Sequence, residues 1–286
     1  MKIIKEISAM QDIADFHRRT GNKIGLIPTM GFLHEGHVSL MIKAKDECDI
    51  IITSIFVNPT QFNPDEDFSE YPRDFMRDYH ICKSSGVNYI FYPETINMFS
   101  DDYHTYINVE DLSEKLEGKF RPGHFRGVVT VVSKLFNICK PHKAYFGQKD
   151  AQQAVIIKKM SEDLNIDVEI EICPTVREEN GLAVSSRNTY LSGKEKSEAT
   201  ALNGALNEGK ELILEKHLYD AKEVKEKIKE YIEKKSPNTS IQYIAITDNK
   251  NLVKLENLAD YNGEILISLA AFHGKTRLID NILFIK

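Results

Sequence analysis

The chain has 286 residues, 42% of them hydrophobic, which is the composition of an ordinary soluble protein with one large or two modest domains. A formal net charge of −6 argues against a nucleic-acid partner, and no apolar run is long enough to predict a membrane helix. The first residues lack the features of a signal peptide. The four cysteines are isolated, which predicts free thiols in a reducing cytoplasm rather than a zinc or redox motif.

The first part of the chain predicts a helix, a strand and a second helix. Residues 8–11 match a capping box and Gly21 can end a helix, so we expect a first helix over residues 9–19. The apolar run 23–27 predicts a buried strand, and hydrophobic residues at helical spacing predict a helix over residues 38–45. This order is typical of an anion site, because a helix N-terminus presents unpaired N–H groups and a partial positive charge.

The turn between this strand and this helix carries two histidines and two glycines. His34 and His37 stand three residues apart, so they share one face where the helix begins. Gly31 and Gly36 allow a ligand to approach the backbone closely. Two imidazoles at an anion site can bind or protonate a transferring phosphate. A motif this short is also consistent with a simple turn that exposes its histidines.

Polar side chains follow the next strand. The β-branched run 50–57 predicts a parallel strand buried on both faces, and Asn58 and Gln61 come soon after it. Ligands of α/β sheets bind at the carboxyl ends of the strands, so these two amides can recognise a hydroxyl or a carboxylate, and a polar turn is the alternative. A helix over residues 72–84 and a strand over residues 87–92 come next.

A cationic segment precedes the second half of the chain. Residues 118–127 contain three glycines, two arginines and a histidine, which predicts a flexible loop suited to a polyanion, or simply a solvated loop tip. It lies between a short predicted helix over residues 111–117 and an apolar helix over residues 128–138.

A second strand-to-helix junction predicts a second anion site. The strand at residues 144–146 leads through Gly147 into another helix. Lys149 supplies a point charge for a phosphate, and Gln153 lies one helical turn further on the same face. Asp150 can hold the lysine, a ribose hydroxyl or the helix N-terminus.

The last third of the chain changes in character. After a strand at residues 167–172, the segment Ser185, Ser186 and Arg187 suits a phosphate, with an exposed turn as the alternative. From a capping box at Ser192, the pattern predicts two charged helices and three strands, at residues 195–216, 221–234, 241–247, 263–272 and 277–284. We therefore predict an α/β protein, with a Rossmann-like parallel sheet in domain 1–180 and a smaller α+β domain over residues 181–286.

Four candidate anion segments on one scaffold, with two amides between them, indicate a nucleoside triphosphate beside a small polar substrate. The same segments resemble the pantoate–β-alanine ligase (pantothenate synthetase) family, part of the Rossmann-like nucleotidylyltransferase superfamily with an H-x-G-H motif. The matching segments, in the family's order and spacing, are PTMGFLHEGH (28–37), FVNPTQF (56–62), YPRD (71–74), GKFRPGHFRGV (118–128), FGQKDAQQ (146–153) and SSRN (185–188).

The resemblance implies a role for each segment. The implied catalytic residues are His37, His34, Lys149 and Arg187. The implied ATP site consists of Met30, Gly31, Phe32, Leu33, His34, Glu35, Gly36, His37, Gly147, Gln148, Lys149, Asp150, Val176, Val184, Ser185, Ser186 and Arg187. The implied pantoate site consists of Asn58, Gln61, Arg121, Val128, Val132 and Gln153, and Gln61 would also contact β-alanine.

The implied reaction is the ATP-dependent condensation of (R)-pantoate with β-alanine, which gives pantothenate, AMP and pyrophosphate through a pantoyl adenylate. Mg²⁺ would accompany ATP without a dedicated protein metal site. The C-terminal domain would act as a lid, and the protein would be a cytoplasmic homodimer that binds neither nucleic acid nor membrane.

Two positions depart from the family pattern. Val184 replaces the methionine usual beside adenine, and Arg77 precedes Asp78 where the family often has adjacent acids. Two rival functions stay open from the sequence. One is another adenylyl transferase that acts on a phosphorylated acceptor, and the other is a nucleotide-binding regulatory protein without turnover.

Overall fold

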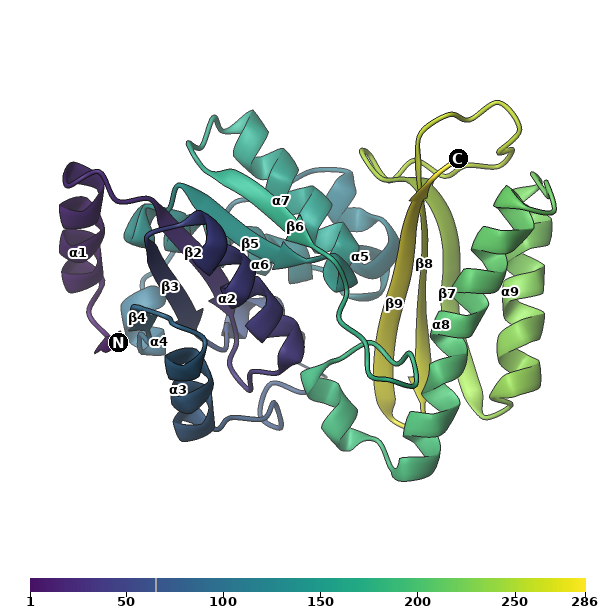
Figure 1. The fold of residues 1–286 in the computed structure, drawn as a ribbon, viewed down its shortest axis with the longest axis horizontal. Coiled ribbons are helices and arrows are strands. Elements are labelled where there is room, and N and C mark those ends of the chain that lie inside the picture. Colours follow the sequence, from purple (N-terminus) through teal and green to yellow (C-terminus); the bar gives the residue numbers. More distant parts are fainter. Residues whose placement is uncertain (65) are drawn as a thin grey trace. The chain divides into compact units, whose positions relative to one another are not determined.

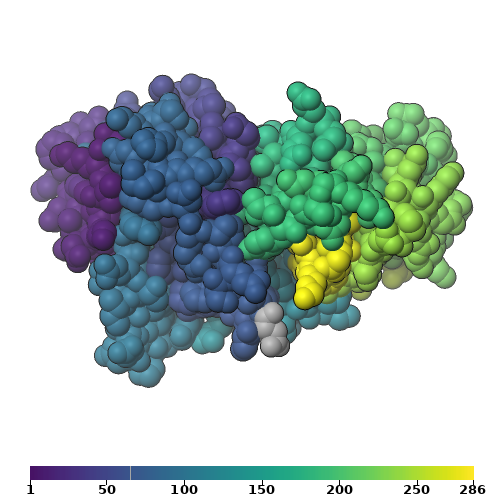
Figure 2. Space-filling model, turned by 90° about the horizontal axis from the view of Figure 1, so that it is seen from below, coloured from purple at the N-terminus to yellow at the C-terminus, as the bar shows by residue number. Residues whose placement is uncertain are grey.

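The structure is a computed structural model that describes residues 1–64 and 66–286. The chain forms two compact units, the first with residues 1–148 and 156–174 and the second with residues 149–155 and 175–286. Figure 2 colours the surface by residue number, with purple to teal for the N-terminal part of the chain and green to yellow for the C-terminal part. The sequence predicted domains 1–180 and 181–286, and the main change of unit falls between residues 174 and 175.

A parallel sheet forms the centre of the first unit (Figure 1). Its six strands follow the order β1-β4-β3-β2-β5-β6, and every neighbouring pair is parallel. This confirms the predicted Rossmann-like class. The strands are β1 Lys2–Ile4, β2 Ile24–Thr29, β3 Ile50–Ile55, β4 Tyr89–Phe91, β5 Lys143–Gly147 and β6 Glu169–Cys173.

Side chains cover both faces of the central strand β2. Ile27 packs in one cluster with Leu40 and Met41 of α2. Successive strand residues point to opposite faces, so the adjacent buried Leu26 fills the other face. The helices up to residue 163 are α1 Ile7–Arg19, α2 Glu35–Glu47, α3 Phe75–Ser84, α4 Thr95–Met98, α5 Leu116–Phe120, α6 His124–Cys139 and α7 Ala151–Asp163, with the short 3-10 helices η1 Pro59–Gln61, η2 Leu112–Glu114 and η3 Gln148–Asp150.

The strand order reverses between β2 and β5. β5 pairs with β2 through Gly25 and Leu26, and β2 continues alongside β3 as far as Thr29. Pro28, which lacks an N–H, is tolerated there because this end of β2 is paired with β3 alone. In open α/β sheets, ligands bind outside the carboxyl ends of the strands at such a reversal. The segments that follow β2 and β5 are therefore the expected ligand-binding segments.

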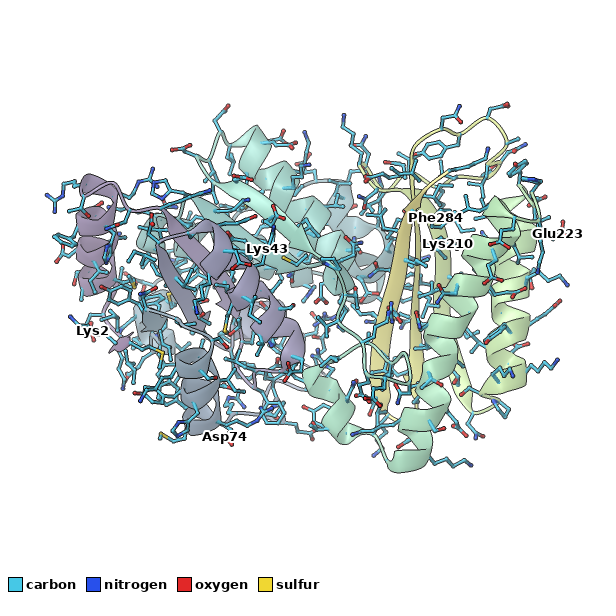
Figure 3. All side chains as sticks on the ribbon, viewed as in Figure 1. Lys2, Lys43, Asp74, Lys210, Glu223 and Phe284 are labelled. Carbon is cyan, nitrogen blue, oxygen red and sulfur yellow. The ribbon has the colours of Figure 1, made fainter. Side chains whose placement is uncertain are left out.

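The second unit is an antiparallel sheet covered by two helices. Strands β7 Thr239–Asp248, β8 Glu264–His273 and β9 Thr276–Ile285 follow the order β7-β8-β9, and helices α8 Gly193–Leu214 and α9 Ala221–Lys235 pack on them (Figure 1). The capping box at Ser192 is confirmed, since its hydroxyl accepts the N–H of Glu195 and the Glu195 carboxylate accepts the N–H of Ser192 at 2.8 Å. The charged side chains of α9, such as Glu223, lie on its exposed side (Figure 3).

Three local predictions were wrong or incomplete. The first helix begins at Ile7 after Glu6, whose side chain caps nothing, so the predicted capping box at residues 8–11 lies inside the helix. Residues 118–127 are no flexible loop, because α5 extends to Phe120 and α6 begins at His124. β1 and α4 were not predicted, since three or four residues carry too little pattern. No helix among residues 1–64 and 66–286 is both long and apolar enough to cross a membrane.

Candidate functional site

The turn after β2 departs from the sheet through a strained stretch of backbone. The Thr29 hydroxyl donates to the Ser54 carbonyl at 2.7 Å and accepts the N–H of Gly31 at 3.1 Å. Gly31 has φ +83°, and Phe32, with φ 50°, also lies in the left-handed region that disfavours a side chain. Strain of this kind persists only where the surroundings hold it, and it clusters at functional sites.

Asp78 of α3 holds this turn in place. Its carboxylate accepts the N–H of Phe32 at 2.8 Å and that of Leu33 at 2.7 Å, and the residue is 1% exposed. Burial raises the pKa of the Asp78 carboxyl, and the two N–H bonds oppose that rise. A Cβ at Gly31 would lie 2.9 Å from Asp78 Oδ2, so the glycine is required by the close approach as well as by its φ.

The two histidines form one pair at the start of α2. His34 is the residue before the first helical turn, and its backbone N–H donates to Nδ1 of His37 at 3.2 Å. The imidazole centroids are 4.1 Å apart. Because Nδ1 of His37 accepts a hydrogen bond, the neutral ring carries its proton on Nε2. Gly36 leaves room for the His34 ring, since a Cβ there would lie 3.0 Å from it. The predicted pairing of the histidines is confirmed.

Asn58 and Gln61 form a buried amide network connected to this turn. Asn58 begins η1, where its Oδ1 accepts the N–H of Thr60 at 3.2 Å, and its Nδ2 donates to Gln61 Oε1 and to the Gly127 carbonyl, each at 3.1 Å. Gln61 Nε2 donates to the thioether sulfur of Met30 at 3.0 Å. Asn58 is 1% exposed and Gln61 8%, so both amides are buried although they belong to the polar turn η1 and its cap.

One arginine of the cationic segment, Arg121, is paired within the protein. The Arg121 guanidinium forms a bidentate pair with Glu66, and one of its nitrogens lies 3.1 Å from His124 Nε2. His124 Nδ1 donates to the Gln61 carbonyl at 2.7 Å, and burial together with the Arg121 charge lowers the pKa of His124 to about 4. His124 is therefore neutral near pH 7. It holds the main chain of Gln61 through this hydrogen bond and offers no charge to a polyanion.

The first helical turns of α6 fit closely against η1. A Cβ at Gly127 would overlap the Thr60 carbonyl and approach Gln61 N to 2.7 Å, so only glycine allows this contact. Val128 and Val132, predicted to pack on pantoate, are buried on α6 at 2% and 4% exposure. A pocket of about 390 Å³ lies in the same unit beside Met30 and Phe32, with Phe56, Arg73 and Asp78 in its lining.

Carboxylates near the turn are engaged inside the protein. Asp74 begins α3 (Figure 3) and accepts the N–H of Arg77 at 3.0 Å, while Asp78 holds the turn. The Arg77 guanidinium lies over the Phe32 ring at 4.7 Å. Across residues 1–64 and 66–286, no group of three or more His, Cys, Asp or Glu side chains could hold a metal ion.

The second unit carries the other predicted phosphate residues. Lys149 Nζ lies 3.7 Å from the Asp150 carboxylate. The main-chain carbonyl of Lys149 accepts a hydrogen bond from Asn281 Nδ2 at 2.9 Å. Gln153 lies in the first turn of α7, and Gly147 and Gln148 end β5 and begin η3 in the first unit. Val176 and Val184 are brought together, since the Val184 N–H donates to the Val176 carbonyl at 3.0 Å in a small hairpin.

This hairpin leads into the serine–arginine segment. Ser185 caps the 3-10 helix η4 Ser186–Tyr190, where its hydroxyl accepts the N–H of Arg187 at 3.3 Å. Ser186 is 7% exposed. The segment is thus a 3-10 helical turn in which Arg187 is half-buried rather than exposed.

The sequence missed the residues that support these segments. Arg177 and Asp280 form a bidentate pair at 2.7 and 2.9 Å, and Asn281 follows Asp280 on β9. The available signal was an acidic residue in the middle of an apolar strand, because an isolated charge is rarely buried without a partner. No pattern in one sequence identifies that partner.

A parallel sheet with paired histidines at a helix N-terminus beside its reversal point is typical of an α/β enzyme that acts on an anionic ligand. The family model "Pantoate-beta-alanine ligase" matches residues 2–283. The pantothenate synthetase of Acetivibrio thermocellus is 50% identical over 283 residues, 99% of either chain, and that of Caldicellulosiruptor saccharolyticus is 51% identical over 282 residues, 99% of either chain.

Solved structures agree with this match. A pantothenate synthetase from Thermus thermophilus superposes with a TM-score of 0.91 at 36% identity, covering 99% of either chain. The Francisella tularensis pantoate-beta-alanine ligase, complexed with beta-gamma ATP and beta-alanine, superposes with a TM-score of 0.79 at 37% identity, covering 99% of this chain and 97% of that one. The chain belongs to the pantoate–β-alanine ligase family, and it is therefore a ligase that forms an amide bond.

Proposed function

We propose that the protein joins (R)-pantoate to β-alanine in two steps that consume ATP. The pantoate carboxylate attacks the α-phosphate of ATP, which forms pantoyl adenylate and expels pyrophosphate. The β-alanine amine then attacks the acyl carbon, the amide forms, and AMP leaves with the former carboxylate oxygen. Both nucleophiles belong to substrates, so the protein has to position them and stabilise developing charge.

The turn at residues 30–37 is the observation that best supports this proposal. The N-terminus of α2 favours an anion, and the neutral His37 ring, whose Nδ1 accepts the His34 N–H, would carry a proton on Nε2 that can be donated to a phosphate oxygen. We assign the triphosphate to His34, His37, Lys149, Ser185, Ser186 and Arg187, and the adenosine to the remaining residues of the implied ATP site.

Pantoate is assigned to the amide network beside the turn. Gln61 and Gln153 would bind its polar groups, and Val128 and Val132 would pack on its methyl groups. In the structure, Gln61 is already oriented by Asn58 and His124, so its amide is pre-organised for a hydroxyl or carboxylate. Gln61 would also contact β-alanine, and Arg121, compensated by Glu66, would line the site.

Magnesium would arrive with the triphosphate, whose phosphate oxygens supply ligands for it. We further propose that the second unit acts as a lid over the nucleotide, and that the protein works as a homodimer in the cytoplasm, as the sequence resemblance implies.

An isotope experiment tests the two steps. The protein is incubated with ATP, Mg²⁺ and pantoate labelled with ¹⁸O in its carboxylate, with and without β-alanine. The proposal predicts pyrophosphate with pantoate alone, and sustained AMP carrying one ¹⁸O only after β-alanine is added. Release of ADP, or unlabelled AMP, would contradict an adenylate. Pyrophosphate release that ignores pantoate would leave an adenylyl transferase for another acceptor.

Two substitutions test the assigned phosphate residues. Lys149→Ala and His37→Ala are each expected to slow pantoate-dependent pyrophosphate release by roughly 10²-fold or more, the scale for losing one preorganised donor. Lys159→Ala, which removes an exposed lysine paired with Asp163 on α7, is the matched control and should act like wild type. Unchanged pyrophosphate release in both site variants would refute their assignment.

A further inference from the structure

The ion pair that Lys149 forms with its neighbour Asp150 is weak. The 3-10 turn η3 has three residues. The ion pair with Asp150 spans 3.7 Å, and the Asp150 side chain is 48% exposed. An exposed pair of this kind adds little, and a lysine side chain is flexible along its whole stem. A lysine that has to meet a phosphate therefore needs its main chain fixed by something else.

That support comes from β9, the yellow C-terminal strand in Figure 1. The side-chain amide of Asn281 donates to the main-chain carbonyl of Lys149 at 2.9 Å, the optimal distance for such a bond. Asn281 is 5% exposed, so water does not compete for the bond. The bond is partly buried, so a carbonyl left without this donor would carry a desolvation cost, which keeps the two residues together.

Asn281 is itself fixed by the ion pair beside it. Asp280 Oδ1 accepts both a guanidinium nitrogen of Arg177 at 2.9 Å and the N–H of Asn281 at 2.8 Å. Arg177 also donates to the Asn281 carbonyl at 3.4 Å and to the Gly181 carbonyl at 3.2 Å. The same pair thus closes the hairpin that leads into the serine–arginine segment and sets the strand position from which Asn281 reaches Lys149.

We propose that Asn281 is a positioning residue for adenylation, which holds the main chain of Lys149 so that its ammonium group meets the triphosphate, and that the Arg177–Asp280 pair aligns Asn281 with the segment at residues 185–187. Two phosphate-binding segments far apart in the sequence would then share one support. The proposal rests on the proposed function, because it needs Lys149 to bind phosphate.

A double-mutant cycle tests it. Binding of ATP with Mg²⁺, without pantoate, is measured by calorimetry for wild type, Asn281→Ala, Lys149→Ala and the double variant. Asn281→Ala should weaken ATP binding about three- to tenfold, the scale of one positioned hydrogen bond, and raise the KM for ATP while the KM for pantoate stays unchanged. In the Lys149→Ala background it should add nothing, since no ammonium group is left to position.

Two further variants keep the outcome clear. Asn281→Asp preserves the shape but cannot donate to the carbonyl, so it should reproduce the loss even if the alanine variant folds poorly. Asn207→Ala removes an amide that donates to the Asn203 carbonyl on α8, and it should bind ATP normally. Equal losses with and without the Lys149 side chain would overturn the positioning role alone. ATP binding by Lys149→Ala at wild-type strength would overturn the phosphate assignment and, with it, this proposal.

Discussion

The two units support their candidate ligand-binding segments by different means. In the first, the buried Asp78 and His124 bond to main-chain N–H and carbonyl groups of the segments they hold. In the second, Asp280 pairs with the guanidinium of Arg177. A support built on backbone dipoles keeps a titratable group that responds to pH, whereas an ion pair requires both charges at once. The group to be held decides which support is used. The turn after β2 presents main-chain N–H groups, whereas the hairpin before residues 185–187 begins at Arg177.

Breaking the ion pair should have the largest effect on stability. Asp280→Leu leaves the Arg177 charge without its buried partner and should lower the free energy of unfolding by about 3–5 kcal/mol. The double variant Arg177→Met/Asp280→Leu should recover most of that loss, since well-packed apolar residues replace such pairs at little cost. Urea unfolding measures both. Glu233→Ala, which removes an exposed partner of Lys229, is the control and should change little.

The pH dependence should separate the two kinds of support. Since the pKa of His124 is lowered to about 4, the unfolded chain binds the proton more tightly, and the free energy of unfolding falls as the pH drops from about 6.5 to 4. The full shift corresponds to roughly 3 kcal/mol at the acid end.

His124→Asn, whose amide can still donate to the Gln61 carbonyl, should remove this part of the acid loss. Urea titrations of wild type and variant at each pH give the difference curve. Parallel curves for the two proteins would show that His124 does not titrate in this range. Asp78 should act in the opposite sense, because a raised pKa makes its contribution to stability fall as the pH rises through its titration.

A pair of glycine variants should sharpen the account of the turn. Gly31 and Gly21 both have φ near +80°, but a Cβ at Gly31 would press on Asp78 and Ile55, whereas at Gly21 it meets nothing within 4 Å. Both alanine variants carry the backbone strain. The free energy of unfolding should therefore fall by about 1–3 kcal/mol more in Gly31→Ala than in Gly21→Ala, which is the scale of overpacking. Only Gly31→Ala should also slow pyrophosphate release. Equal shifts of the melting temperature in the two variants would mean that the turn accommodates the extra Cβ without displacing Asp78.

The smallest change in stability is expected at Gly147. A Cβ there meets nothing within 4 Å, so Gly147→Ala should alter the free energy of unfolding by less than about 0.5 kcal/mol. If ATP approaches this backbone, as the site assignment requires, the affinity of Gly147→Ala for ATP should still fall by about tenfold. Calorimetry beside thermal unfolding separates the two effects, and wild-type affinity for ATP would remove Gly147 from the nucleotide site.

Much of the first unit follows from local pattern. The strands and helices around His34 and Lys149 were predicted because buried parallel strands are continuous apolar runs and glycines mark the turns between them. The cationic segment misled for a physical reason. Gly127 serves the close contact of α6 with η1, and Arg121 is paired with Glu66, which is distant in the sequence.

The supports themselves could not be predicted, because each joins residues that the chain brings together only on folding. Asp78 lies 46 positions from Phe32, and Asn281 lies 132 positions from Lys149. An acidic residue in an apolar strand signals that a partner exists, yet the identity of that partner is a property of the tertiary fold.

The contact between Gln61 and Met30 has a consequence for oxidative chemistry. A thioether is a weak acceptor, so a substrate oxygen can take over the Gln61 amide at little cost. Oxidation of Met30 to the sulfoxide would replace that sulfur with a strongly polar S=O group beside the same amide. We expect mild peroxide to weaken pantoate binding and, because Met30 is also assigned to the ATP site, ATP binding with it, and methionine sulfoxide reductase to restore both. The sulfur that holds the Gln61 amide in the absence of substrate would then also make substrate binding sensitive to oxidation.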